Sequence, residues 1–203
     1  MYVPKNMELS NSDAITSLIS GYGFGLLISP DMETTRLPLL YESGTESSSI
    51  LGHMARANPQ WRDLSGKRVS VVFNGPHSYI SPRWYVSKPA VPTWNYASVQ
   101  CFGIFQELNS IETLSAIYAL IRKYEPELMG KEELMPSDYI DKLLKAVVGF
   151  KVVVSEIHAK EKLGQHKNPE DQHGVFHALR TSPSSESKEL ADYMQKRGLG
   201  IGS

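Results

Sequence analysis

The segment from His53 to Trp61 combines residue types that suit anion binding. It reads HMARANPQW, and we expect Arg56 and Asn58 to share one face of a strand, because alternate strand residues point the same way. A guanidinium group binds oxyanions through two parallel N–H donors, so the pair suits a phosphate or a carboxylate. An arginine paired with an acidic side chain at the edge of the core is the alternative.

A second polar and aromatic segment runs from Asn74 to Tyr85 and reads NGPHSYISPRWY. Its Gly-Pro and Ser-Pro steps predict a loop with a defined path. Ser81 in this loop offers a hydroxyl group and neighbouring backbone donors to an anion. A packed aromatic corner is the alternative.

The third segment, from Val91 to Tyr96, reads VPTWNY. Trp94 and Tyr96 flank Asn95, so two rings can pack on a planar heterocycle while the amide bonds to its edge. A dimer interface is also rich in Trp and Tyr, and the two interpretations are compatible.

The other reactive residue types form no catalytic or metal-binding signature. His173 and His177 are four residues apart, but no third ligand lies near them in the sequence. Phosphate-binding glycine loops and the serine nucleophile motif are both missing. We therefore predict no metal site and assign no catalytic residue.

Short strands separated by turns must position the three segments. Runs rich in β-branched and aromatic residues predict strands over 24–28, 34–40, 50–57, 67–74, 93–105 and 147–157. A first helix is expected from an N-cap at Asn11 or Ser12 to a stop at Gly21, and helical spacing predicts helices over 111–124 and 137–145. Asn109 and Glu112 have the spacing of a capping box at the start of the second of these three helices. A last helix should run from Pro183, capped by Ser182, to Arg197, with Gly198 as its stop. Residues 160–174 are expected to form a charged loop. The order favours a mainly β, α+β fold: one domain over residues 1–203 with an antiparallel barrel, peripheral helices and a C-terminal helical addition.

Composition limits the partners and the location. The 203 residues carry a net charge of −1, whereas a dedicated DNA-binding domain usually has a clear basic excess. No run approaches the roughly 20 apolar residues of a membrane span, and the N-terminus lacks the pattern of a signal peptide. The lone cysteine, Cys101, excludes an internal disulfide and fits a small core residue. We expect a cytoplasmic protein without membrane contact, for which direct DNA binding has no support in charge or motif.

Together the three segments resemble the signature of the PaiB-type family of FMN-binding negative transcriptional regulators. The opening Tyr2–Lys5 and the run Val148–Phe150 are similar to that family as well, so the resemblance spans nearly the whole chain. It implies an antiparallel FMN-binding split β-barrel, related to pyridoxamine phosphate oxidase-like proteins. It also implies a homodimer with FMN at the subunit interface.

The resemblance further implies which residues contact FMN. Arg56 would hold the phosphate, assisted by Asn58, Ser81 and Thr35. Trp94, Asn95 and Tyr96 would lie near the isoalloxazine ring, from the same or the partner subunit. The cofactor-binding set implied by similarity is Thr35, His53, Arg56, Asn58, Ser81, Trp94, Asn95, Tyr96, Lys162 and Gln165.

Two stretches depart from the family pattern. The chain has Thr35-Arg36-Leu37-Pro38 where the family shows Thr-His-Leu-Pro. It has KLGQHK over residues 162–167 where the family shows Lys-x-Ser-Gln-Asn-Arg. Lysine can neutralise a phosphate, but it lacks the planar fork of arginine, so this loop bears on whether FMN is bound.

Three functions follow from the resemblance. The first is an FMN-binding regulator that acts as a repressor, although no helix-turn-helix is legible between the predicted helices 111–124 and 137–145. The second is an FMN-dependent oxidoreductase that uses NADH or NADPH, in which the flavin supplies the chemistry. The third, ranked lowest, is a haem-binding split-barrel protein with a histidine ligand.

Overall fold

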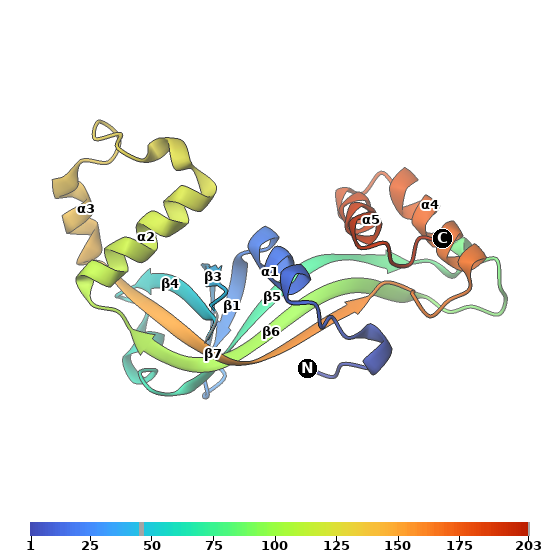
Figure 1. The fold of residues 1–203 in the computed structure, drawn as a ribbon, viewed down its shortest axis with the longest axis horizontal. Coiled ribbons are helices and arrows are strands. Elements are labelled where there is room, and N and C mark those ends of the chain that lie inside the picture. Colours follow the sequence, from blue (N-terminus) through green and yellow to red (C-terminus); the bar gives the residue numbers. More distant parts are fainter. Residues whose placement is uncertain (45–46, 203) are drawn as a thin grey trace. The chain divides into compact units, whose positions relative to one another are not determined.

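A seven-stranded sheet runs through the computed structural model, which describes residues 1–44 and 47–202 (Figure 1). The strand order is β2-β1-β5-β6-β7-β4-β3, and the pairings β1–β2, β1–β5, β3–β4 and β4–β7 are antiparallel. The strands are β1 (Phe24–Ile28), β2 (Thr34–Pro38), β3 (Leu40–Glu42), β4 (Ser49–Ala55), β5 (Arg68–Ile80), β6 (Thr93–Glu107) and β7 (Val147–Lys162). The predicted antiparallel β fold with peripheral helices is confirmed.

Five α-helices and four short 3-10 helices occur among the described residues. The α-helices are α1 (Ser12–Gly21), α2 (Ser110–Tyr124), α3 (Ser137–Leu144), α4 (Pro169–Thr181) and α5 (Ser185–Arg197). The 3-10 helices are η1 (Lys5–Met7), η2 (Pro59–Asp63), η3 (Pro82–Trp84) and η4 (Pro126–Leu128). None of the helices in the described part of the chain has the length and apolar character needed to cross a membrane.

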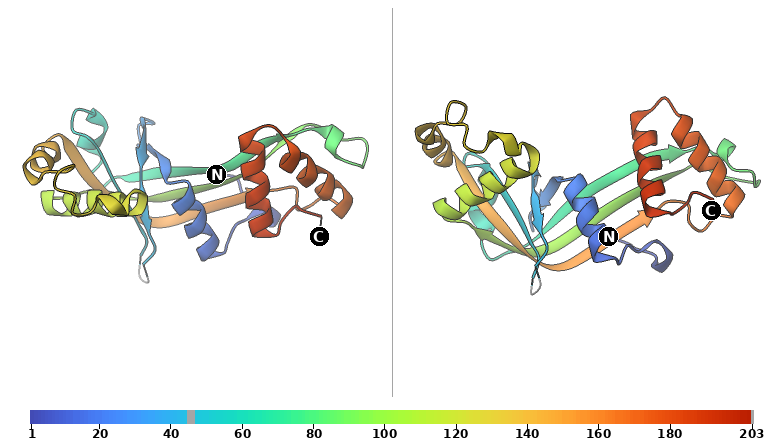
Figure 2. Two further views of the ribbon diagram at one scale, coloured as in Figure 1. Left: turned by 90° about the horizontal axis from the view of Figure 1, so that it is seen from above. Right: turned by 45° about the horizontal axis from the view of Figure 1, so that its top comes forward.

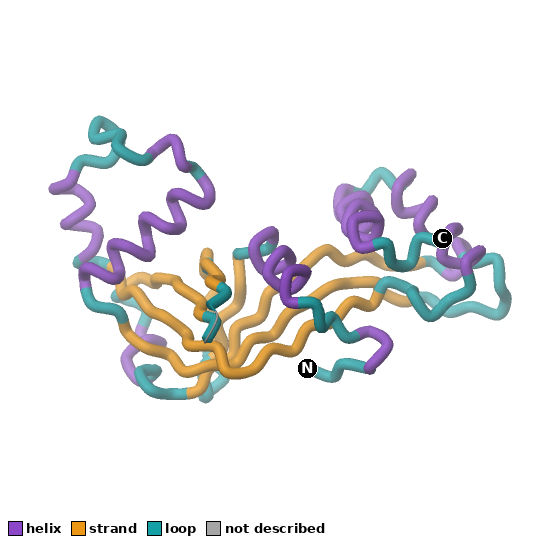
Figure 3. Tube along the Cα trace, viewed as in Figure 1, coloured by secondary structure: helices purple, strands orange, loops and turns teal. Residues whose placement is uncertain are grey.

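The chain forms two compact units. The first unit comprises residues 1–15, 74–99 and 158–203, and the second comprises residues 16–73 and 100–157. The long strands β5, β6 and β7, drawn in orange in Figure 3, supply residues to both units. The division of the protein into domains, expected to be a single one, stays a prediction.

The second unit is built around aromatic side chains from three strands. Phe73, Phe105 and Phe150 are fully buried, and the rings of Phe105 and Phe150 stack with centroids 4.9 Å apart. Cys101 is also fully buried there, and burial raises the pKa of its thiol to about 12, so the predicted core role is confirmed. Large apolar surfaces removed from water in this way are the main driving force for folding.

A hydrogen-bonded cluster ties β2 to the segment that follows β4, although the two strands are distant in the sheet order. The Asn58 amide donates to the Thr35 hydroxyl at 2.9 Å, and that hydroxyl donates to Gln60 Oε1 at 2.6 Å. The Gln60 amide in turn donates to the carbonyl of Glu33 at 2.8 Å. These bonds hold one end of the sheet near the other, as the closure of a barrel requires.

The first unit has its own core, in which α4 and α5 lie side by side (Figure 2). Ile80 and Leu163 from the strand ends pack against Leu179 of α4 and Leu190 of α5. Gly174 lets α4 approach η3 closely, because a Cβ atom there would lie 2.3 Å from the carbonyl oxygen of Trp84. A buried ion pair adds to this packing: Arg197 of α5 donates to both carboxylate oxygens of Glu161, at 2.7 and 3.1 Å.

Several local predictions were wrong. Arg56 and Asn58 do not share a strand, since β4 ends at Ala55 and Asn58 caps η2 by accepting from Gln60 N–H at 3.0 Å. The cause is Pro59, which fits the first position of such a helix and cannot continue a ladder.

The segment Gly75–Ile80 is part of β5, not a loop. Among the described residues, β1 pairs with β5 at residues 70–72. Pro76 lies beyond this pairing, where β5 needs no N–H donor towards β1, so a proline is tolerated in the strand.

The region 160–174 is not a loop throughout, because it contains the end of β7 and the start of α4. Asn168 caps α4 and Pro169 occupies its first turn, a start signal that was legible in the sequence. The last helix is capped by Ser184 rather than Ser182, and it ends as predicted at Gly198, whose φ of 63° is left-handed.

Candidate functional site

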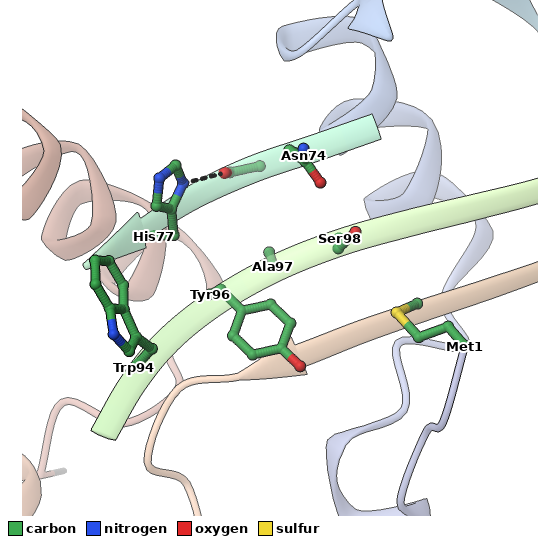
Figure 4. A pocket seen from close by; sticks show the side chains of 8 residues that line it. Met1, Asn74, His77, Trp94, Tyr96, Ala97 and Ser98 are labelled. Atoms are coloured by element: carbon green, nitrogen blue, oxygen red, sulfur yellow. Dashed lines mark hydrogen bonds between the residues drawn. The ribbon is translucent and has the colours of Figure 1, made fainter. Parts of the chain in front are cut away.

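An open pocket lies on one face of the strands in the first unit. It has a volume of about 360 Å³ and is lined by His77 of β5 and by Trp94 and Tyr96 of β6, among others (Figure 4). Trp94 is 51% exposed, and its ring centroid lies 6.1 Å from that of His77. The three rings come to one face because alternate residues of a strand point the same way.

The surroundings of the aromatic pocket hold its rings in place. Tyr79 meets Trp94 edge to face at a centroid distance of 6.3 Å, the geometry that aromatic quadrupoles favour. The Lys160 ammonium lies 5.4 Å from the centre of the Tyr96 ring. His77 Nδ1 contacts the Gly75 carbonyl oxygen at 3.2 Å, drawn as a dashed line in Figure 4.

A second, cationic pocket of about 150 Å³ also belongs to the first unit. Its lining includes Asn95, Lys162, His166 and Lys167. Lys162 donates to the Thr93 hydroxyl and to the Trp94 carbonyl, the latter at 2.8 Å. Burial lowers the pKa of Lys162, and burial together with the neighbouring Lys167 and Lys162 lowers the pKa of His166.

Asn95 lies in this cationic pocket and not with the flanking rings. It is only 2% exposed and lines this pocket together with Lys162. Strand alternation separates it from Trp94 and Tyr96. The structure thus brings together Trp94 with Tyr96 in one pocket, and Asn95 with Lys162 in the other.

Gln165 and Ser81, also in the first unit, are engaged in local structure. Gln165 accepts from Leu163 N–H at 2.8 Å and donates to the carbonyls of Asn6 and Glu161. Ser81 caps η3 by accepting from Arg83 N–H at 3.2 Å. Their roles as FMN ligands stay predictions.

The other members of the predicted set belong to the second unit. Thr35 and Asn58, together with Gln60, form the hydrogen-bonded cluster that ties β2 to the segment after β4. The Arg56 guanidinium donates to the carbonyls of Lys145 and Val147 at 3.0 and 2.9 Å. His53 lines a third, apolar cavity between helices. These four assignments also stay predictions.

The sequence prediction did not single out His77, Thr93, His166 or Lys167, although all four line one of the two pockets. His77 lies two residues from Tyr79, so period-two spacing would have placed both on one face. The Gly-Pro and Ser-Pro steps predicted a loop there, and a loop has no such period. In the 162–167 stretch the sequence predicted Lys162 and Gln165 as ligands but not His166 or Lys167, because their place in the pocket depends on the turn that brings residue 166 back towards β6.

Comparison with known proteins agrees with the fold and the motifs. Residues 1–156 match the family model described as "Putative FMN-binding domain". The chain is 34% identical over 206 residues to the protease synthase and sporulation protein PAI 2 of Bacillus subtilis, covering 97% of this chain and 98% of that one. It is 27% identical to an uncharacterized protein of Emericella nidulans, covering 83% of each chain.

Two solved structures share the fold. One is the flavocytochrome Anf3 from Azotobacter vinelandii, with a TM-score of 0.63 and 11% identity over 79% of this chain and 72% of that one. The other is an FAD and heme binding protein from Mycobacterium smegmatis, with a TM-score of 0.59 and 14% identity over 77% and 73%. At such identities the likeness concerns the fold alone, and it confirms the predicted split barrel. The family match and the Bacillus relative show that this chain belongs to the PaiB-type family of FMN-binding split-barrel proteins, whose cofactor is FMN or a related flavin.

Proposed function

We propose that the chain binds FMN through the first unit, with the isoalloxazine ring in the pocket of His77, Trp94 and Tyr96. This pocket carries the proposal, because its open aromatic wall suits a flat conjugated ring. Its volume of about 360 Å³ lies within the range of about 300–1,000 Å³ that is typical of cofactor sites. Bound flavin would supply redox chemistry, whereas the residues of this chain position the ring.

The cationic pocket supports a site for the FMN phosphate. Lys162 and Lys167 bring positive charge, and the amide of Asn95, which lines the same pocket, can donate N–H groups to an anion. Lys162 already bonds to Thr93 and to the Trp94 carbonyl, which holds its ammonium at the ring-bearing strand and leaves a third N–H for an anion. The altered 162–167 stretch therefore still offers cations to a phosphate.

A homodimer with FMN at the subunit interface is part of the proposal. Trp94 and Tyr79 are 51% and 45% exposed on the same face, and adjoining exposed aromatic side chains often mark an interaction surface. A partner subunit that covers this face would shield the ring from water and could supply Arg56, Asn58 or Thr35 to the phosphate. The proposed location is the cytoplasm.

The membership in the PaiB-type family supports the further proposal that the chain acts as a negative regulator of transcription. The structure adds α4, which begins where the sequence predicted a loop, and joins it to the predicted last helix α5 through residues 182–184 alone, a spacing found in helix-turn-helix proteins. However, the exposed acidic residues Glu186, Glu189 and Asp192 of α5 offset its exposed Lys188 and Lys196, so the helix has no basic excess to attract phosphate. We therefore propose regulation without direct DNA contact by this helix, and retardation in a low-salt gel-shift experiment would contradict it.

Titration with FMN and with riboflavin, which lacks the phosphate, tests the flavin proposal. Trp94→Ala should lower the affinity for both flavins at least tenfold, because it removes a ring from the pocket. Lys162→Met should lower the affinity for FMN about tenfold and leave the affinity for riboflavin unchanged. The matched controls Tyr124→Ala and Lys188→Met replace exposed residues outside both pockets and should bind like the parent. Absence of saturable flavin binding by the parent protein would overturn the proposal.

A further inference from the structure

The second unit contains an apolar cavity that the flavin proposal does not use. Its volume is about 250 Å³, and its wall is formed largely by α2 and α3, with Leu114, Ile117, Ile140 and Leu144 among the lining side chains. No Lys, Arg, Asp or Glu lines it within the described chain. A charged ligand such as a phosphate is therefore disfavoured, because its charge would have no partner.

Specific packing positions the helices around the cavity. The capping box of Asn109 and Glu112 starts α2, and Thr113 seats that helix against Gly149 of β7, where a Cβ atom would lie 2.3 Å from the threonine hydroxyl. None of the side chains of α3 is buried in the described structure, and Leu143 remains 49% exposed. The apolar side of α3 thus faces an unfilled space instead of a packed core.

One polar group at the wall lacks a partner. His53 of β4 lines the cavity, and its Nδ1 atom is buried without a hydrogen bond in the described structure. Buried polar atoms are nearly always paired, so an orphan of this kind calls for a water molecule or a ligand. Burial also lowers the pKa of His53, which keeps the imidazole neutral at neutral pH.

We propose that this cavity binds a neutral aromatic molecule of one or two rings that carries a hydroxyl group bonded to His53. A dry cavity of about 150 Å³ accommodates benzene, so the larger space here suits up to two fused rings. Tyr118 and Tyr139 add aromatic surface to the wall. A hydroxyl group both donates and accepts, so it satisfies Nδ1 in either tautomer of the imidazole.

The experiment compares 2-naphthol with naphthalene, which has the same rings but no hydroxyl. Binding is followed by probe fluorescence on FMN-saturated protein, so that any flavin site is already filled. The parent should bind 2-naphthol saturably and roughly fivefold more tightly than naphthalene, the effect of one hydrogen bond. His53→Phe should abolish this preference while still binding naphthalene, and His53→Gln, whose amide can also donate and accept, should retain it.

Leu144→Phe provides an independent variant, since the larger side chain fills the cavity. This variant should lower the affinity for both probes at least tenfold and leave the affinity for FMN unchanged. Its urea unfolding midpoint checks that it folds. The proposal is overturned if the parent binds neither probe, which would mean that water alone satisfies His53, or if His53→Phe keeps the preference for 2-naphthol. It is also overturned if Trp94→Ala, and not Leu144→Phe, removes probe binding. Because the flavin titrations are read separately, failure of the flavin proposal would leave this result interpretable.

Discussion

The Asn58 amide donates to the Thr35 hydroxyl at 2.9 Å and thereby joins the segment after β4 to β2. The sequence predicted that both residues contact a phosphate, but in the structure their polar groups form hydrogen bonds with each other and with Gln60. A hydroxyl or amide that satisfies an intramolecular bond can still contact a ligand, but its first effect is on the stability of the barrel.

We predict that Asn58→Ala lowers the free energy of unfolding by about 1–2 kcal/mol, because it removes both the bond to Thr35 and the cap of η2. Urea unfolding followed by circular dichroism measures the change. Asn11→Ala, which removes only the capping bond to Ala14 N–H, is the matched control and should cost less. A loss of FMN affinity at unchanged stability would instead show that Asn58 is a ligand first.

Arg56→Ala should lower the affinity for FMN about tenfold and leave the affinity for riboflavin unchanged. Two nitrogens of the guanidinium are held by the carbonyls of Lys145 and Val147, which orients the group and leaves Nη1 available to a phosphate. Parallel titrations with the two flavins measure the difference, and Arg62→Ala in the neighbouring η2 serves as control. Equal losses for both flavins would show that Arg56 only anchors the backbone between α3 and β7.

The ion pair between Arg197 and Glu161 should stabilise the first unit. Arg197→Met should destabilise the protein by about 3 kcal/mol, since it leaves the Glu161 carboxylate, 3% exposed, without its cationic partner. The urea midpoint reports the loss. Arg180→Met removes a hydrogen bond to Gln195 and a cation-π contact with Phe176 at an exposed position, and it should cost far less. Similar midpoints for the two variants would disprove the importance of the buried pair.

Stability should fall in acid in part through Asp171. The backbone N–H of Ser87 donates to Asp171 at 2.8 Å, and this bond lowers the pKa of the carboxyl below its ordinary value of 3.8. A lowered folded-state pKa means that the unfolded chain binds the proton more tightly, so the contribution is present above the ordinary value and disappears as the pH falls through the folded-state value.

Asp171→Asn should therefore show a shallower decline of the urea midpoint between about pH 5 and pH 2 than the parent protein. Asp192→Asn, at an exposed position of α5, is the control and should follow the parent. An unchanged slope for Asp171→Asn would contradict the assigned bond.

Much of the fold was determined by sequence alone, because its signals are local. The capping box of Asn109 and Glu112, the stop at Gly198 and the strand runs 24–28 and 93–105 depend on neighbouring residues only, and all were found as expected. The family signature likewise identified the split barrel and its flavin, since the three motifs occur in the order and spacing of that family.

Tertiary structure decided what each polar side chain does. Pro76 lies within β5 because, in the described part of the chain, β1 does not extend beside it, and sequence period cannot reveal which edges a sheet leaves open. Arg56 is committed to carbonyls about 90 residues away in the chain, and Asn95 is separated from Trp94 and Tyr96 by the alternation of a strand. A motif specifies residue types. Which of their donors and acceptors are already hydrogen-bonded depends on contacts between distant segments, and these contacts exist only in the folded chain.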